Sequence, residues 1–310
     1  MPPVWRIPDA GATEAAHVTA WRTFGAVLHL TRYQQNLLFT LVLTVLGVVT
    51  AGAPFSTAAA LVLVANWCAI AFAFMVNNIA DAQDDRSTAE KCHANPVSMQ
   101  TLSPAAAGCA AGIVAAISLM LFVSLGARAT LAGLGCILLG VFYSWRRVRL
   151  KSIPFLDVLS HVLMLGVLPY WAAVWACAPH ARPACWLSLL IAATSAYGQL
   201  YNQVRDMDDD QRAGLHTSAM LLGVPHTWHL LVVLLCATAA GVSYALAAGL
   251  VPSWLRVPAS SAGIIAIAYL WRQRQQPSRV LADRFHLIIL VLAAASALAW
   301  LVTVWAGAPG

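Results

Sequence analysis

Two short clusters of carboxylates are the residues of this chain best suited to chemistry. They hold eight of its twelve acidic residues, and each follows an asparagine in the same spacing, N-x-x-x-D-x-x-x-D. The two motifs span 77–85 and 202–210, and their members are Asn77, Asp81 and Asp85, then Asn202, Asp206 and Asp210. On a helix, steps of four residues drift by only about 40°. Each motif is therefore predicted to form one stripe of oxygen ligands along a helix end.

Carboxylates this close together repel one another, and burial near hydrocarbon raises that cost. A bound cation removes the repulsion, and an all-oxygen ligand set selects a hard ion. Carboxylates with open coordination positions suit Mg²⁺ that bridges to phosphate. Two facing stripes are therefore predicted to hold one diphosphate through bound Mg²⁺. The competing interpretation is a pair of solvated acidic loops, which the shared asparagine register disfavours.

Basic residues that could hold a diphosphate lie close to both motifs. Lys91 follows the first motif and Arg212 follows the second. The stretch that begins at Tyr143 carries four positive charges, and the tyrosine offers a hydroxyl to a phosphate oxygen. We predict that Lys91 and one residue of this stretch bind the substrate, the candidates being Arg147 and Lys151. The competing interpretation is a loop whose charges only orient the chain in a membrane.

Asp157 and His161 lie four residues apart near the start of an apolar run. An ionisable side chain at membrane depth is a functional candidate by default. A structural Asp–His pair accounts equally well for the same spacing. Both interpretations stay open at the level of the sequence.

The elements that position these residues follow from the composition of the chain. Of its 310 residues, 60% are hydrophobic and 10% are charged, with a mean hydropathy of +0.74. Soluble domains carry about 25% charged residues. A soluble fold of this size could not bury so much apolar sequence, so lipid must be the solvent. The seven cysteines form no Cys-x-x-Cys pair, which argues against a zinc or thiol-redox centre.

Nine apolar runs approach the roughly 20 residues that a spanning helix needs. Proline, glycine or charge separates them, and they lie near 34–53, 56–79, 104–125, 128–145, 153–177, 184–204, 227–250, 254–271 and 285–307. We predict an all-α integral membrane protein whose nine transmembrane helices form one bundle. The two acidic motifs then lie at the ends of the second and sixth helices.

The Lys and Arg residues predict the orientation of this bundle. With a cytoplasmic N-terminus, fifteen of the eighteen fall in cytoplasmic segments, which include a tail over 1–22. This bias follows the positive-inside rule and places the C-terminus on the opposite side. The net charge of +6 then reflects topology and anionic lipid headgroups. Nucleic-acid binding is disfavoured because the basic residues are spread over five segments.

At these residues the chain resembles the UbiA superfamily of intramembrane prenyltransferases, over essentially its whole length. That family carries an N-x-x-x-D-x-x-x-D motif after its second helix and another Asp-rich motif after its sixth. Tyr143 with Arg147 resembles a diphosphate-contacting Tyr-x-x-x-Lys element, with Arg in place of Lys. Lys91, with Asn95 and Pro96, resembles a basic Asn-Pro element of the loop between the second and third helices.

The resemblance implies a single transmembrane domain over 1–310 with its active site on the cytoplasmic side and Mg²⁺ as cofactor. The implied metal ligands are Asn77, Asp81, Asp85, Asn202, Asp206 and Asp210, of which the four aspartates are the implied catalytic residues. The implied diphosphate contacts are Lys91, Tyr143, Arg147, Lys151 and Arg212. Two positions depart from the family pattern, since Asn78 stands where many members have Asp and Trp145-Arg146 where many have prolines.

The implied reaction is prenyl transfer within a lipid bilayer. Bound Mg²⁺ clamps the diphosphate of an allylic isoprenoid, and the C–O bond ionises as the leaving pyrophosphate is stabilised. An electron-rich acceptor, often an aromatic carbon in this family, attacks the allyl cation in a cavity shielded from water. A terpene cyclase would use the same site without a second substrate, and this alternative stays open. An ion transporter would carry its acids in mid-span and is disfavoured. We expect a bacterial inner membrane as the location.

Overall fold

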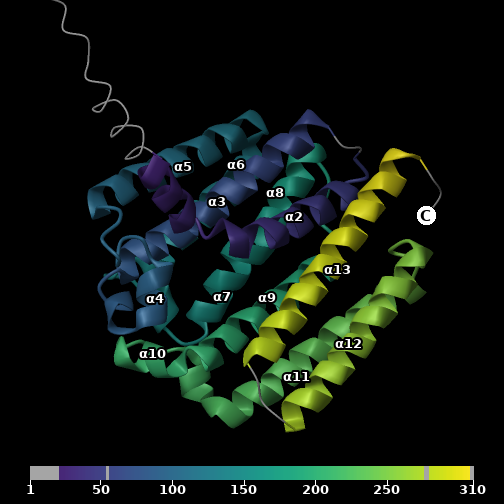
Figure 1. Cartoon of the computed structure of the whole chain (residues 1–310). Coiled ribbons are helices and arrows are strands. Elements are labelled where there is room, and N and C mark those ends of the chain that lie inside the picture. The colour runs from purple at the N-terminus through teal and green to yellow at the C-terminus, as the bar shows by residue number, and fades with distance from the viewer. Residues whose placement is uncertain (1–20, 54–55, 276–278, 308–310) are drawn as a thin grey trace, which may run out of the picture.

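The computed structural model describes residues 21–53, 56–275 and 279–307, which form helices and contain no strand (Figure 1). The long helices are α2 (Tyr33–Thr50), α3 (Thr57–Asp81), α5 (Pro104–Ser124), α6 (Ala127–Ser144), the pair α7 (Leu156–Val162) and α8 (Leu168–Cys177), α9 (Cys185–Arg205), α11 (Ser218–Ala247), α12 (Arg256–Gln275) and α13 (Arg279–Trp305). Two short helices lie on the loops between them, α4 (Ala89–Ala94) and α10 (Met207–Arg212). A further helical stretch covers 21–30.

Each predicted apolar range coincides with one of these long helices or with the α7–α8 pair. In the described part of the chain, seven spans are long and apolar enough to cross a membrane by length and composition. α9 and α12 fall short because polar residues lower their mean hydropathy, such as Gln199 and Gln203 in α9 and, near the ends of α12, Arg256 and Arg272. The all-helical architecture is confirmed, while nine spans and the orientation of the termini stay predictions. Most of the predicted tail over 1–22 lies outside the described residues.

Two helices depart from their predicted ranges, and each departure has a local cause. The fifth run passes through a π-helical turn at Leu163–Val167 between α7 and α8. Pro169 follows this turn and has no N–H to donate, so a widened turn accommodates its ring. α11 begins at Ser218 rather than near 227, where the Thr217 hydroxyl caps it by accepting from Met220 N at 3.4 Å. A kink at Gly223, with φ 74° and ψ 157°, divides α11, and the long segment after this kink corresponds to the predicted seventh helix.

The helices form one bundle in which the last helix, α13, packs beside α2 (Figure 1). α2 packs against α3, α8 and α13, so the last helix lies beside the first long one. α3 also packs on α5 and α6, while α9 packs on α7 and α11. This order brings the ends of α3 and α9 to the same side of the bundle, where α4 and α10 lie close together in Figure 1.

Close packing joins α2, α3 and α8 within the bundle. A Cβ at Gly47 of α2 would lie 2.5 Å from the Cβ of Ala173 on α8, so only glycine allows this approach. Asn66, buried in α3, donates to Thr44 Oγ1 on α2 and to Pro169 O on α8, both at 3.0 Å. These contacts fix α2, α3 and α8 to one another.

Asp157 and His161 do not form the structural pair considered from the sequence. The fully buried Asp157 carboxylate accepts from Ser218 N at 2.6 Å, Ser218 Oγ at 2.5 Å and Gln203 Nε2 at 2.7 Å. His161 Nδ1 instead lies 3.3 Å from Ser195 Oγ. Asp157 therefore joins α7 to α9 and to the first turn of α11, which is a structural role.

Replacing Asp157 by Ala should destabilise the protein, because the buried donors of Ser218 and Gln203 lose their acceptor. Each buried group left unpaired costs about 1–3 kcal/mol, so the free energy of unfolding should fall by roughly 3 kcal/mol. Chemical unfolding in detergent measures this change. Asp283→Ala removes an exposed carboxylate from α13 and is the matched control. Equal stability of the two variants would contradict the structural role of Asp157.

Candidate active site

Side chains from two loops terminate α3 next to the first acidic motif. The last carbonyls of a helix have no partner within it. Here Asn95 Nδ2 donates to Asn78 O at 2.8 Å and Ser98 Oγ to Ala82 O at 2.8 Å. Arg146 Nε, from the loop after α6, donates to Ala80 O at 3.2 Å. The helix end is therefore tied to both loops that carry basic residues.

The predicted helical stripe is wrong for the last member of the first motif. α3 ends at Asp81, and Asp85 begins a short 3₁₀ turn, Asp85–Ser87. The cause is Asn95, whose amide caps the end of α3 and also donates to Asp85 Oδ2 at 2.8 Å. Asp85 is thus positioned by the following loop rather than by helical register.

The second motif keeps its four-residue spacing although the helix is interrupted. Asp206 lies between α9 and α10 with φ −99° and ψ 7°, outside regular helix geometry. Asp206 N still donates to Asn202 O, and Asp210 N to Asp206 O, both at 2.9 Å. The backbone of the second motif therefore keeps its four-residue register with a bend at its centre, while the stripe of ligands stays a prediction.

Basic residues from the loop after α6 hold the first motif. Lys151 Nζ forms an ion pair with Asp81 and donates to Asn77 Oδ1 at 3.1 Å. Arg149 pairs with Asp84 at 2.8 Å and with Asp81 at 3.5 Å. Lys151 is buried, so little water screens this attraction. Lys151, a predicted diphosphate contact, thus lies beside the acids, as does Arg149, which was not among the predicted site residues.

One ion pair joins the loop after the first motif to the second motif. Lys91 Nζ, from α4, lies 3.2 Å from Asp209 Oδ2 of α10, and Thr88 Oγ1 donates to Asp209 Oδ1 at 3.4 Å. The exposed Arg212 pairs with the same carboxylate at 2.9 Å. Asp206 is paired with the adjacent Arg205 at 3.0 Å. The loops that follow the two motifs therefore meet, as the prediction of a shared site requires.

Arg32 is a site residue that the sequence did not reveal. It precedes α2, and its Nη2 donates to Asn78 Oδ1 at 2.5 Å. Its Nε is buried and has no hydrogen-bond partner among the described residues. The guanidinium lies in the electrostatic field of Asp81, Asp85 and Asp206, which come from both motifs. Only the fold could indicate this role, because Arg32 is 46 residues from Asn78.

Burial changes the acidity of groups in these loops. Burial is the largest cause that raises the pKa of Asp210 to about 6; the nearby Asp206 adds to the increase, and Lys91 opposes it. Burial also raises the pKa of Asp85, which the hydrogen bond from Asn95 opposes. Negative charge is thus costly here, so the site favours a proton or a cation beside these carboxylates.

Three predicted residues lie apart from these contacts. The Tyr143 hydroxyl accepts from Gln199 Nε2 at 2.9 Å. Arg147 is exposed, with its guanidinium 5.9 Å from the centre of the Trp145 ring. Asn202 is also exposed. Their roles in binding metal or diphosphate stay predictions.

The donor set fits a hard cation that brings further ligands with it. Within 21–53, 56–275 and 279–307, no three His, Cys, Asp or Glu side chains are close enough to hold a metal ion alone. Mg²⁺ in phosphate sites typically takes one or two carboxylates and completes its shell with phosphate oxygens and water. Carboxylates of the two motifs, with oxygen as their only donor atom, match that requirement.

Comparison with known proteins identifies the family of the chain. A model of the UbiA prenyltransferase family matches residues 36–292. A curated relative from Haloarcula japonica, described as a lycopene elongase/hydratase, is 32% identical over 163 residues. That match covers 51% of this chain and 52% of the relative, so it spans about half the length of that protein.

Solved structures share the fold. A UbiA homologue from Archaeoglobus fulgidus bound to GPP and Mg²⁺ superposes with a TM-score of 0.72 at 21% identity, over 89% of this chain and 99% of that one. The apo structure of a UbiA homologue from Aeropyrum pernix K1 superposes with a TM-score of 0.73 at 18% identity, over 86% of this chain and 98% of that one. Because the family model covers most of the chain, the protein belongs to the UbiA prenyltransferase family and is a multi-pass integral membrane protein.

Proposed function

We propose that this protein transfers a prenyl group from an allylic isoprenoid diphosphate to an acceptor, with Mg²⁺ as cofactor. The observation that carries the proposal is that the loop after the first acidic motif meets the second motif on one side of the bundle, through the Lys91–Asp209 ion pair. The basic residues around these motifs are Arg32, Lys91, Arg146, Arg149, Lys151, Arg205 and Arg212. A diphosphate with a divalent cation is complementary to both kinds of charge.

Mg²⁺ suits the oxygen donors of the site, and the A. fulgidus homologue binds GPP together with Mg²⁺. The ligands in this chain would be Asp81, Asp85, Asp206 and Asp210, with the amide oxygens of Asn77 and Asn202. When bound, Mg²⁺ supplies Lewis-acid stabilisation of the leaving diphosphate.

The basic residues would exchange partners when substrate enters. Lys151 now holds Asp81 and Asn77, and Arg149 holds Asp81 and Asp84. Once the carboxylates serve as metal ligands, these cations can turn to diphosphate oxygens. They would neutralise the charge that grows on the leaving group as the allylic C–O bond breaks.

We propose an electron-rich carbon as the acceptor. The carbon attacks the allylic group and then loses a proton, which completes the transfer. The family resemblance favours an aromatic ring, while the name of the H. japonica relative adds a polyene such as lycopene as a candidate. That name also favours prenyl transfer over the terpene cyclase alternative, which needs no acceptor.

We further propose that all nine long helical segments span the membrane and that the motifs face the cytoplasm. Four predicted spans separate the end of α3 from the end of α9, so both motifs reach the same face. The distribution of Lys and Arg favours the cytoplasm for that face. A bacterial inner membrane is the proposed location.

Removing one carboxylate from each motif should abolish turnover. We expect Asp81→Ala and Asp206→Ala to lower kcat by roughly a thousandfold, because the diphosphate loses metal-held stabilisation. Pyrophosphate release is measured with purified protein, Mg²⁺ and allylic diphosphates of increasing chain length. Glu90→Gln removes an exposed carboxylate from the same loop and should leave kcat unchanged. Full activity in both Asp variants would disprove the role of the motifs.

The same assay separates the alternatives for the second substrate. Turnover only after addition of an aromatic acid or a polyene identifies a prenyltransferase and its acceptor class. A cyclic hydrocarbon formed without an acceptor, and lost in Asp81→Ala, identifies a terpene cyclase instead.

Mg²⁺ affinity should depend on pH in a predictable direction. Burial raises the pKa of Asp210 to about 6 in the metal-free protein, and the pKa of Asp85 is raised as well. Only the deprotonated carboxylate binds the ion, so affinity should be lost as the pH falls from about 7 to about 5. Calorimetric titration of substrate-free protein measures this loss.

Asp210→Asn is the control for that titration. It has no proton to release, so it should bind Mg²⁺ more weakly and with a smaller pH dependence. An affinity that is constant over the same pH range in the unmodified protein would contradict the assignment of Asp210 as a ligand.

A further inference from the structure

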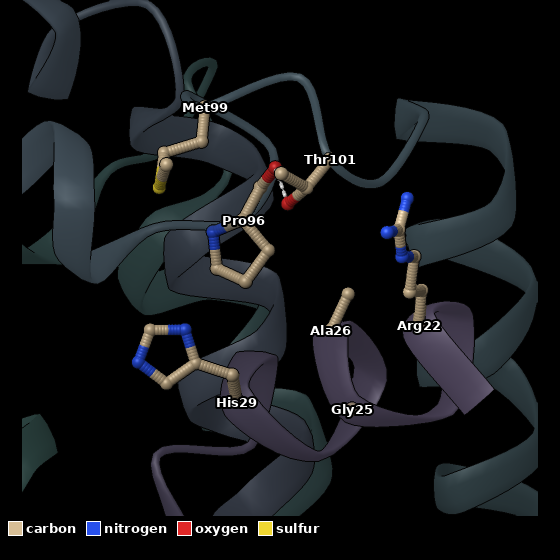
Figure 2. A pocket seen from close by; sticks show the side chains of 7 residues that line it. All are labelled: Arg22, Gly25, Ala26, His29, Pro96, Met99 and Thr101. Atoms are coloured by element: carbon tan, nitrogen blue, oxygen red, sulfur yellow. Dashed lines mark hydrogen bonds between the residues drawn. The ribbon is translucent and has the colours of Figure 1, made fainter. Parts of the chain in front are cut away.

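A pocket of about 590 Å³ lies outside the acidic site, between the helical stretch 21–30 and the turn 96–101 (Figure 2). Its lining residues are Arg22, Gly25, Ala26, His29, Pro96, Met99 and Thr101. The turn follows α4 and leads directly into α5, which begins at Pro104. The pocket therefore lies where a predicted membrane helix meets the aqueous phase, on the same side as the acidic motifs.

The pocket combines positive charge with apolar walls. Arg22 and His29 extend from one face of the helical stretch, with Ala26 between them (Figure 2). Neither side chain is paired with a carboxylate of the described residues. Pro96 and Met99 supply apolar surface opposite them. Such a site is complementary to an anion that carries an apolar body.

The adjacent face of the same helical stretch is suited to lipid. Trp21 and Phe24 are 71% and 59% exposed, and their rings meet edge to face at 6.1 Å. Val27 and Leu30 on the other side pack against the core formed with α3 and α5. Aromatic side chains are enriched at the headgroup level of membranes. The stretch is therefore held against the bundle, and its exposed aromatic rings are of the kind found at the depth of lipid headgroups.

From these two faces we infer that the pocket binds the phosphate of an anionic phospholipid headgroup. Arg22 and His29 hold the phosphate, and the glycerol and upper acyl chains extend over Trp21 and Phe24. A free phosphate would use the two basic side chains but leave the exposed aromatic rings unexplained. The inference concerns a second site and does not depend on the reaction proposed above.

Native mass spectrometry of the full chain in detergent, titrated with phosphatidylglycerol or phosphatidylcholine, tests the inference. The unmodified protein should retain phosphatidylglycerol more strongly than phosphatidylcholine. Arg22→Gln should weaken that binding roughly fivefold, as expected for one cation near a lipid surface, and Arg22→Lys should retain most of it. Arg22→Gln combined with His29→Gln should weaken it further. Both residues are exposed, so these variants leave the core intact.

Arg272→Gln is the matched control, because it removes an exposed positive charge from α12, far from the pocket in sequence. It should leave phosphatidylglycerol binding unchanged. Equal retention of both lipids by the unmodified protein would overturn the inference, as would a double variant that binds like the control. Displacement of the lipid by inorganic phosphate at equal concentration would also overturn it, since the site would then select a free anion.

Discussion

Repulsion among the carboxylates at the ends of α3 and α9 is the constraint on which the arrangement of the loops depends. Basic side chains from separate parts of the chain balance it. Arg32 comes from the segment before α2, Lys91 from α4, and Arg149 and Lys151 from the loop after α6. Each loop is therefore held in place by charge as well as by packing. The balance is incomplete at Asp210, where burial still raises the pKa of the carboxyl to about 6.

The last carbonyls of α3 have no partner within the helix and need hydrogen-bond donors from other parts of the chain, close to the same carboxylates. Arg146 contacts both kinds of group, since its Nε donates to Ala80 O and its Nη2 pairs with Asp84. Asn95 does the same for Asn78 O and Asp85. Because one side chain satisfies backbone and carboxylate together, the end of the helix and the position of the acids are set jointly. A substrate that draws the basic side chains away would leave the Asn95 contacts to hold the helix end.

The sequence indicates the helices and the shared site because both rest on local patterns. Apolar runs predict the helices, and two motifs separated by an even number of spans must reach one face. Contacts set by long-range geometry could not be predicted. Arg149 adopts a left-handed backbone conformation, φ +46°, within the loop that carries the acid-binding cations, while Arg147 lies exposed over Trp145. Similarly, Asp85 leaves the predicted helical face because of Asn95, a residue that helical periodicity does not connect to it.

The Asn95 amide has only two hydrogens, and both are committed, one to the last turn of α3 and one to Asp85. The chain between Asp85 and Asn95 therefore acts as a spacer of fixed length. One inserted or deleted residue would turn the amide away from both acceptors at once, although the motif letters would be unchanged. In chimaeras between members of this family, the end of α3 and the loop from Asp85 to Asn95 should therefore be exchanged together. A crossover between them would separate the predicted metal ligands from Asn95, the residue that positions Asp85.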